Sequence, residues 1–363
     1  MTGWQPDRAC DLCGRGYAYE DRAWQCRCGG TLSIHEAGQH DSIALGEGGT
    51  PMLRLPQMSG DVRAKLEFLS PTSSFKDRGA ATMVARLRRI GVREVADDSA
   101  GNAGVSIAAY CAAAGIGCRI FVARSANLER LAAIRCYGAE VTVVDGGREA
   151  AAQAALESGA YFAGHAWDPF FVEGLTGVAA EIAAQSGDDP AARVIFPLGQ
   201  GTLLLGLVKG FGALVASGRL QAAPELVAVQ TDACAPLHEA MLRGLDRLPA
   251  MTRPTQATAD GIAVASPVRW RSLIALLRRG TARVVAAQDR AVPACVRALG
   301  RCGLAVEPTA SVVLDALRQL EPAPGRTVLI LTASALKTQG ALQAIVGRAG
   351  ANSCASGGAR DLV

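Results

Sequence analysis

The chain has 363 residues, of which 50% are hydrophobic and 19% are charged. A chain of this size can bury a large core and is expected to form more than one domain. Its formal net charge of +4 is small and spread along the sequence, which favours neither a nucleic-acid partner nor a membrane surface. The apolar runs are shorter than the roughly 20 residues that span a bilayer.

The cysteine content and the N-terminus indicate a reducing compartment. The chain has eleven cysteines, an odd number, and its first residues lack the apolar core of a signal peptide. We therefore expect a cytoplasmic protein with free thiols rather than a disulfide framework.

The first 40 residues carry two cysteine pairs, Cys10-x2-Cys13 and Cys26-x-Cys28, on glycine-containing turns. Two thiolate pairs at this spacing are typical of a zinc ribbon with four cysteine ligands. The second pair is one residue shorter than the usual C-x-x-C. Metal loss, substitution by His35 or His40, and a set of unrelated free thiols therefore stay open. A closed four-thiolate site has no open coordination position, so we assign it no catalysis.

The stretch Ser70–Gly79 joins a predicted strand at 62–68 to a predicted helix at 80–90. Lys76 is expected at or just inside the N-terminus of that helix. The candidate N-cap residues are Thr72, Ser73 and Ser74. The helix dipole and burial both lower the pKa of an amine in this position, which makes Lys76 a candidate Schiff-base nucleophile. The chain has only four lysines against 33 arginines. The alternative is a solvated lysine in a polar turn.

Strands and helices alternate along the rest of the chain. The expected strands are 93–96, 118–122, 141–144, 194–198, 226–229, 282–285 and 327–331. The expected helices are 105–114, 128–137, 148–157, 171–185, 203–215, 235–243, 269–279, 290–300 and 311–320, and the segment 340–346 is expected to close the fold. Regular alternation with short turns predicts an α/β fold with parallel, doubly wound open sheets.

A glycine loop, Gly199-Gln200-Gly201-Thr202, lies between a predicted buried strand and a predicted helix. Glycines let backbone N–H groups converge on an anion, and the helix dipole adds to the attraction, so this loop is a candidate phosphate site. A tight strand-to-helix turn is the alternative. The loop lacks the Lys-Ser/Thr of a P-loop and the spacing of a dinucleotide fingerprint, so no nucleotide is expected.

Two other turns also come after strands. In Ser99-Ala100-Gly101-Asn102, the helix N-terminus could hold a carboxylate and the Asn102 amide could donate to an aromatic oxygen. An ordinary N-cap with a glycine turn is the alternative. Thr332 offers a hydroxyl at a strand end, where open α/β sheets place ligands. Together these turns offer an amine, a loop that can bind an anion, a loop that can bind a carboxylate, and a hydroxyl. This set matches what pyridoxal phosphate requires, namely partners for its Schiff base, phosphate, 3′-oxygen and ring nitrogen.

With these motifs, the chain resembles the threonine synthase-like branch of the fold type II pyridoxal phosphate enzymes over nearly its whole length, ribbon included. Residues 71–79, P-T-S-S-F-K-D-R-G, resemble the family's P-T-G-S-F-K-D-R-G, which implies the Schiff-base role for Lys76. Residues 99–102 resemble S-S-G-N, which implies that Asn102 contacts the 3′-oxygen of the cofactor.

Three segments later in the chain extend this resemblance. Residues 199–202 resemble the family's phosphate loop, and residues 204–211 match the L-L-G-x-x-K-G-F segment that the family has after that loop. Residues 304–311 resemble V-E-P-A-S-A. Residues 331–337 resemble L-T-G-H-G-L-K, which implies that Thr332 lies near the pyridine nitrogen. The implied cofactor-binding residues are Lys76, Asn102, Gly199, Gln200, Gly201, Thr202 and Thr332.

The sequence departs from the family where the substrate is expected. Ala103 replaces a threonine, Ala100 lacks a hydroxyl, and Phe171 replaces the arginine of the N-P-x-R-x-x-G segment. That arginine is expected to bind a substrate phosphate, and losing a charge-assisted contact typically costs about 1.5–3 kcal/mol. The expected substrate-binding residues are Ser99, Ala100, Gly101, Ala103 and Phe171.

The resemblance implies a lyase or synthase that eliminates or replaces a β- or γ-group of an amino-acid substrate, with Lys76 also taking the α-proton. The alternatives are threonine synthase itself, acting on O-phosphohomoserine, and a cysteine or cysteate synthase-like or serine/threonine dehydratase-like enzyme. An inactive scaffold that docks a partner through the ribbon is a further alternative. The resemblance implies a homodimer.

The expected domains come from the motifs and the resemblance. They are a zinc-ribbon-like segment at 1–40, a large cofactor domain at 41–90 and 165–350, a small α/β domain at 91–164, and a flexible tail at 351–363.

Overall fold

A computed structural model describes residues 7–34, 40–124, 126, 128–252, 254 and 256–350. Packing divides the chain into two compact units. Unit 1 comprises Met1–Gly48, Phe75–Val178 and Leu205–Ala213, and unit 2 comprises Gly49–Ser74, Ala179–Leu204 and Leu214–Val363. The domain bounds expected from the sequence stay a prediction. The tail at 351–363 and the alternative zinc ligand His35 lie outside the described residues.

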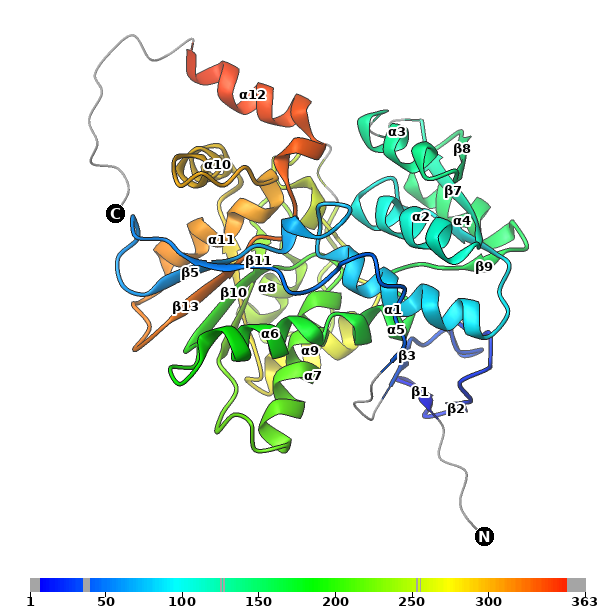
Figure 1. The fold of residues 1–363 in the computed structure, drawn as a ribbon, viewed down its shortest axis with the longest axis horizontal. Helices are drawn as coiled ribbons and strands as arrows, with labels where there is room; N and C mark the ends of the chain where they lie inside the picture. Colours follow the sequence, from blue (N-terminus) through cyan, green and yellow to red (C-terminus); the bar gives the residue numbers. More distant parts are fainter. Residues whose placement is uncertain are drawn as a thin grey trace. The chain divides into compact units, whose positions relative to one another are not determined.

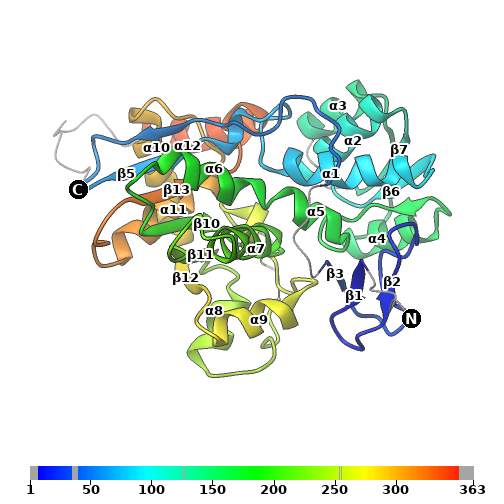
Figure 2. The ribbon, with the colours of Figure 1, turned by 60° about the horizontal axis from the view of Figure 1, so that its bottom comes forward.

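Unit 1 is built on a four-stranded parallel sheet with the order β8-β7-β6-β9. Its strands are β6 (Glu94–Asp97), β7 (Gly117–Ala123), β8 (Glu140–Val144) and β9 (Tyr161–Phe162). Its helices are α1 (Lys76–Arg89), α2 (Asn102–Ala114), α3 (Leu128–Cys136), α4 (Arg148–Glu157) and α5 (Pro169–Gly174). Figure 2 shows α1 and α2 on one face of this sheet and α4 on the other.

Alternation along the strands explains why both faces of this sheet are covered. Val95 and Ile120 belong to the core under α1 and α2, whereas their neighbours Ala96 and Phe121 pack with α4. Because successive side chains of a strand point to opposite faces, apolar residues at both positions require helices on both sides.

The cysteine segment forms a small antiparallel sheet within unit 1, with the order β2-β1-β3. Its strands are β1 (Arg8–Cys10), β2 (Gly16–Tyr17) and β3 (Leu32–Ser33). Two buried arginines, Arg8 from β1 and Arg86 from α1, donate hydrogen bonds of 2.6–3.2 Å to its backbone carbonyls. The accepting carbonyls are those of Ala18, Tyr19, Asp21 and Ala23. Both guanidinium groups also lie over the Phe170 ring of α5, at 5.9 and 4.6 Å, which fixes this segment against α1 and α5.

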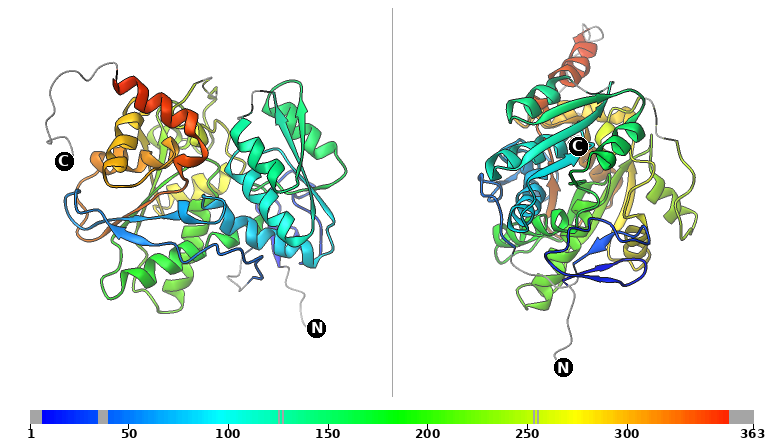
Figure 3. Two further views of the ribbon diagram at one scale, coloured as in Figure 1. Left: turned by 45° about the horizontal axis from the view of Figure 1, so that its top comes forward. Right: turned by 90° about the vertical axis from the view of Figure 1, so that its right-hand side faces the viewer.

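Unit 2 is built on a six-stranded sheet with the order β12-β11-β10-β13-β5-β4, in which β4 alone is antiparallel to its neighbour. Its strands are β4 (Met52–Arg54), β5 (Val62–Lys65), β10 (Arg193–Pro197), β11 (Glu225–Thr231), β12 (Arg283–Ala287) and β13 (Thr327–Ile330). Figures 1 and 3 show α10 and α11 on one face of this sheet and α6 on the other. The short 3-10 turns are η1 (Glu67–Leu69), η2 (Asp260–Ile262), η3 (Asp289–Ala291) and η4 (Ala335–Lys337).

The helices from residue 177 onward lie in unit 2, except that α6 and α7 contribute residues to both units. They are α6 (Gly177–Ser186), α7 (Thr202–Ala216), α8 (Pro236–Leu242), α9 (Trp270–Arg278), α10 (Val292–Arg301), α11 (Pro308–Gln319) and α12 (Gln339–Gly350). Across the described part of the chain, no helix combines the length and apolarity needed to cross a membrane.

The predicted alternation of parallel strands and helices is confirmed, with ends shifted by a few residues. One predicted helix was wrong: the segment 171–185 forms two helices, α5 and α6. The chain turns after Gly174. A Cβ at this glycine would lie 2.0 Å from the Arg78 carbonyl oxygen of α1, so glycine is needed where α5 ends against α1. The strands β1, β2, β3, β4 and β9 were not predicted, because strands of two or three residues are too short to show a hydrophobic periodicity.

The loop that precedes Lys76 holds a strained residue. Ser73 has a φ of 60°, and no other non-glycine residue in the described ranges has a positive φ. The loop is fixed by two backbone hydrogen bonds, Ser73 N–H to the Ser70 carbonyl at 2.7 Å and Ser334 N–H to the Ser73 carbonyl at 3.2 Å. A left-handed L-residue costs roughly 1–2 kcal/mol, and Ser73 is the position at which the resembled motif has glycine.

We expect Ser73→Gly to raise the free energy of unfolding by about 0.5–1 kcal/mol, because relief of the left-handed strain exceeds the entropic cost of glycine. Ser70→Gly is the matched control, since Ser70 has a φ of −65° and glycine there relieves no left-handed strain. Denaturant unfolding monitored by circular dichroism measures both. A Ser73→Gly chain no more stable than its parent would contradict the strain.

Candidate active site

Lys76 is the first residue of α1, as expected, but the predicted N-cap residues do not cap the helix. Phe75 occupies the cap position, and no side chain accepts the first N–H groups. Ser73 and Ser74 are used differently: Ser74 forms a β-bridge with Ala333, and the Ser73 carbonyl accepts the Ser334 N–H. This pairing holds the backbone before Lys76.

The Lys76 amine lies among aromatic rings. Its Nζ atom is 4.5 Å from the ring centroid of Phe75 and 5.8 Å from that of Phe171. Burial of the amine lowers the pKa of Lys76 to about 8, although the charge of Asp97 acts in the opposite direction. At pH 7 about one such amine in ten is neutral, against fewer than about one in a thousand for an ordinary lysine. The predicted nucleophile therefore has the expected environment.

Two glycines allow α5 to approach α1 closely. A Cβ on Gly79, one turn beyond Lys76, would lie 2.4 Å from the Phe171 ring, and a Cβ on Gly174 would lie 2.0 Å from the Arg78 carbonyl. Phe171 is fully buried in this contact. Phe171, which stands where the family has an arginine, therefore packs between α5 and α1, close to the Lys76 amine. Its predicted role in substrate binding stays a prediction.

The loop Ser99–Asn102 comes after β6 and leads into α2. Gly101 is the N-cap residue, and no side chain caps the helix. Ser99 Oγ accepts the Gly101 N–H at 3.3 Å. A Cβ on Gly104 would lie 1.8 Å from the Ser99 carbonyl oxygen, so this glycine lets the loop lie flat against the first turn of α2. Ala103 is buried and Ala100 half-buried, and both present only methyl groups.

Two ionisable residues near Lys76 were missed by reasoning from the sequence. Asp97 ends β6 with its side chain fully buried. His165 comes after β9, and its ring packs edge-on against Phe171 at 5.6 Å. Burial, with the charges of Lys76 and Arg148, holds the pKa of His165 well below its usual value. Asp97 carried a signal that could have been read, since a carboxylate directly after a buried strand lies at the edge where ligands bind.

The glycine loop of unit 2 connects β10 to α7. Gly201 has a φ of +87°, which requires glycine, and α7 begins at Thr202. The Gln200 side chain accepts the Val268 N–H at 3.0 Å, so it anchors the loop. Thr332, also in unit 2, is buried just beyond the end of β13. The placement of both turns after strands is confirmed, and their cofactor contacts stay a prediction.

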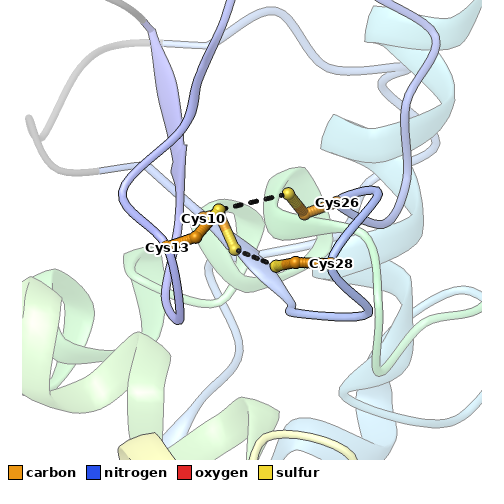
Figure 4. Close-up of side chains that lie close together, drawn as sticks. All are labelled: Cys10, Cys13, Cys26 and Cys28. Carbon is orange, nitrogen blue, oxygen red and sulfur yellow. Dashed lines mark hydrogen bonds between the residues drawn. The ribbon is translucent and has the colours of Figure 1, made fainter.

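The four ribbon cysteines converge as a metal site requires. Their sulfur atoms all lie within 4.8 Å of one another, with Cys10 3.5 Å from Cys28 and Cys13 3.6 Å from Cys26 (Figure 4). Sulfurs around a tetrahedral zinc with Zn–S bonds of about 2.3 Å are about 3.8 Å apart, so the four thiolates fit this ion. The short C-x-C pair therefore does not prevent convergence. His40 lies elsewhere, with its Nε2 3.5 Å from a Glu173 carboxylate oxygen.

Comparison with known proteins gives a consistent result. The family described as "Pyridoxal-phosphate dependent enzyme" matches residues 43–333. A threonine synthase of Methanocaldococcus jannaschii is 29% identical, covering 86% of both chains, and one of Mycobacterium leprae is 29% identical, covering 76% of both.

Two solved structures share the fold. The processed form of threonine deaminase isoform 2 from Solanum lycopersicum has a TM-score of 0.67 at 20% identity, covering 84% of both chains. Maize serine racemase has a TM-score of 0.66 at 19% identity, covering 83% of this chain and 93% of its own.

We expect Gly79→Ala to lower the free energy of unfolding by about 1–3 kcal/mol, because its methyl group would overlap the Phe171 ring. Gly212→Ala is the matched control. It also lies within a helix, but a Cβ there meets nothing within 4 Å, and alanine should stabilise that helix by up to about 1 kcal/mol. Denaturant unfolding measures both changes. Equal effects of the two substitutions would contradict the close packing of α1 and α5.

We expect the purified chain to hold about one zinc ion, and Cys26→Ser to lose it, because a closed site needs all four thiolates. Cys136→Ser removes an exposed cysteine outside the cluster and should leave the zinc content unchanged. Elemental analysis after dialysis measures the metal. A parent chain that stays free of zinc after refolding with the ion would contradict the site.

Proposed function

Because the chain belongs to the family of pyridoxal-phosphate dependent enzymes, we propose that it is a lyase or synthase acting on an amino acid. The proposed reaction is elimination or replacement of a β- or γ-substituent. The observation that carries this proposal is the Lys76 amine, which lies at a helix N-terminus between aromatic rings with a pKa of about 8. An amine of this kind is suited to covalent bonding with an aldehyde.

The residues present fit the cofactor. Ser74 Oγ, two positions before Lys76, is buried without a hydrogen-bond partner among the described residues, as is common for a group that awaits a polar ligand. The glycine loop leads into the 15-residue helix α7, whose N-terminus favours an anion. We propose that Lys76 holds the cofactor aldehyde, Asn102 its 3′-oxygen, the backbone of 199–202 its phosphate, and Thr332 its pyridine nitrogen.

When bound, pyridoxal phosphate supplies an electron sink for negative charge that develops at Cα of the amino acid. Proton transfer and orientation would be carried out by side chains of this protein. The free amine of Lys76 would take the Cα proton on Nζ. Thr332 offers a neutral hydroxyl, which does not force protonation of the pyridine nitrogen and so suits elimination and replacement better than transamination.

The substrate side of the proposal rests on the departures from the family. Phe171 and Ala103 provide no charge and no hydroxyl, and Phe171 is closed into the contact with Gly79. We propose that the substrate carries no phosphate. The loop of Ser99, Ala100 and Gly101, at the start of α2, is proposed to receive the substrate carboxylate. Two of its N–H groups already donate within the protein, Ser99 N–H to Asp97 Oδ2 and Gly101 N–H to Ser99 Oγ.

Threonine synthase itself is the second candidate, supported by the relatives of that name. Dehydratase-like and cysteine or cysteate synthase-like reactions use the same residues and belong to the same proposal. A scaffold that docks a partner through the ribbon needs neither a half-buried amine nor a glycine loop, so both features argue against it. The homodimer implied by the resemblance stays a prediction.

We expect the purified chain to be yellow and Lys76→Ala to be colourless, because the alanine has no amine to bond the aldehyde. Borohydride should remove the visible band of the parent chain and fix the cofactor mass on the peptide that contains Lys76. Uptake of the cofactor by the resolved enzyme should rise through pH 8 as the amine loses its proton. Lys337→Arg keeps a cation at another lysine and should stay yellow. An undiminished band in Lys76→Ala would rule out the assignment.

We expect little or no phosphate release from O-phosphohomoserine, because Phe171 cannot bind a phosphate. A phosphate assay measures this directly, and a panel of unphosphorylated amino acids should include one that shifts the visible band. Rapid phosphate release would instead identify a threonine synthase. A bound cofactor that responds to no amino acid would favour the scaffold.

A further inference from the structure

Arg130 of α3 lies beside the loop that is proposed to receive the substrate carboxylate. Its Nη1 atom is 3.9 Å from the point that a Cβ on Gly101 would occupy, and the Ser99 Oγ atom is 3.6 Å from the same point. Both are ordinary contact distances, so a guanidinium group and a hydroxyl group border the open side of Gly101. The proposed function has not used Arg130.

The packing of α3 against α2 explains this position. A Cβ on Gly104, in the first turn of α2, would lie 3.6 Å from Ile134 Cδ1 of α3. Ile134 is fully buried, and Arg130 comes one turn before it on the same face of α3. The face of α3 that carries Arg130 is therefore held against the start of α2.

The loop itself has used part of its capacity to bind a carboxylate. Ser99 N–H donates to Asp97 Oδ2 at 3.1 Å, and Gly101 N–H donates to Ser99 Oγ at 3.3 Å. Ala100 and Ala103 carry methyl groups where the family motifs have hydroxyls. Moving a carboxylate out of water is costly unless hydrogen bonds or an opposite charge replace its hydration, so a carboxylate bound here needs a partner beyond these residues.

The other cations of this region have different neighbours. Burial raises the pKa of Asp98, and the charge of Arg148 opposes that rise, which places Arg148 near this carboxyl group. Lys76 is assigned to the cofactor aldehyde in the proposed function. Among the described residues, Arg130 supplies the one cation within 4 Å of the open side of Gly101.

We propose that Arg130 and the Ser99 hydroxyl bind the α-carboxylate of the substrate. This inference rests on the proposed function. The Ser99 oxygen accepts the Gly101 N–H, and its own O–H group donates to no residue that the structure describes, so it can donate to the ligand. The planar guanidinium group supplies N–H donors and a permanent positive charge, which suit a carboxylate.

A cation in this position compensates for the hydroxyls that the loop lacks. A hydrogen bond between charged groups is roughly twice as strong as one between neutral groups. The pair of Arg130 and a carboxylate can therefore replace contacts that Ala100 and Ala103 cannot make. An amine without a carboxylate cannot form this pair, so Arg130 selects amino acids over simple amines.

The experiment compares the full-length parent with Arg130→Met, Arg130→Lys and Arg135→Met. Arg135 is an exposed arginine in the last turn of α3 and serves as the matched control. The first readout is titration of the visible band of the holoenzyme with L-alanine and with L-alaninamide, in which a neutral amide replaces the carboxylate. The second readout is modification of Arg130 by phenylglyoxal in the chain freed of cofactor, with and without sodium malonate, quantified by mass spectrometry.

For Arg130→Met we expect L-alanine to bind about 10- to 100-fold more weakly, because a charge-assisted pair is lost, and L-alaninamide to bind as in the parent. Arg130→Lys keeps the charge without the planar group and should lose less. Arg135→Met should bind both ligands as the parent does. In the parent, malonate should slow modification of Arg130 and leave that of Arg135 unchanged. If Arg130→Met does not fold, Arg130→Gln removes the charge and keeps a polar side chain.

An unchanged dissociation constant for L-alanine in the folded, charge-free variants would overturn the inference. An equal loss of affinity for L-alanine and L-alaninamide would do so too, since it would indicate a purely structural role, and so would malonate that gives Arg130 no protection. Failure of the proposed function is a separate result. A parent chain without a borohydride-sensitive band would refute that function, whereas protection of Arg130 is measured without cofactor.

Discussion

The close contact between α1 and α5 determines the environment of Lys76. Glycine at 79 leaves room for the Phe171 ring, and glycine at 174 lets α5 end against the Arg78 carbonyl. Without both, the two helices would have to separate, and the ring that lies 5.8 Å from Nζ would move away with α5. The lowered pKa of Lys76 is caused chiefly by burial, so the chemistry proposed for the amine depends on a packing contact.

The same pair of helices carries the cysteine ribbon. Phe171 faces the Lys76 side of α5, while its neighbour Phe170 lies beneath the guanidinium groups of Arg8 and Arg86. Those arginines are buried and donate to ribbon carbonyls, which replaces hydrogen bonds that these carbonyls would otherwise make to water. A zinc ion bound by the four cysteines would hold the turns of the cysteine segment in place. Arg8 and Arg86 would then connect this segment to α1 and α5. The cysteine segment therefore packs as part of unit 1.

The departures from the family motifs differ in their physical consequences. Ser73 places an L-residue in a left-handed conformation and costs stability, yet the backbone hydrogen bonds of its loop are kept. Phe171 and Ala103 stand where the family motifs have polar residues, and the proposed substrate without phosphate rests on this difference. Backbone strain like that at Ser73 is typical of functional sites.

Local features could be predicted from the residues in order: the alternation of strands and helices, the start of α1 at Lys76, the glycine loop before α7, and the resemblance carried by residues 71–79. These depend on periodicity, turn chemistry and motif spacing, which are properties of neighbouring residues. Only the folded chain established that Phe171 packs on Gly79, that Arg130 lies beside Gly101, and that four sulfurs converge despite a shortened cysteine pair. These contacts join residues distant in sequence, and they are set by how helices and strands pack, which no local pattern encodes.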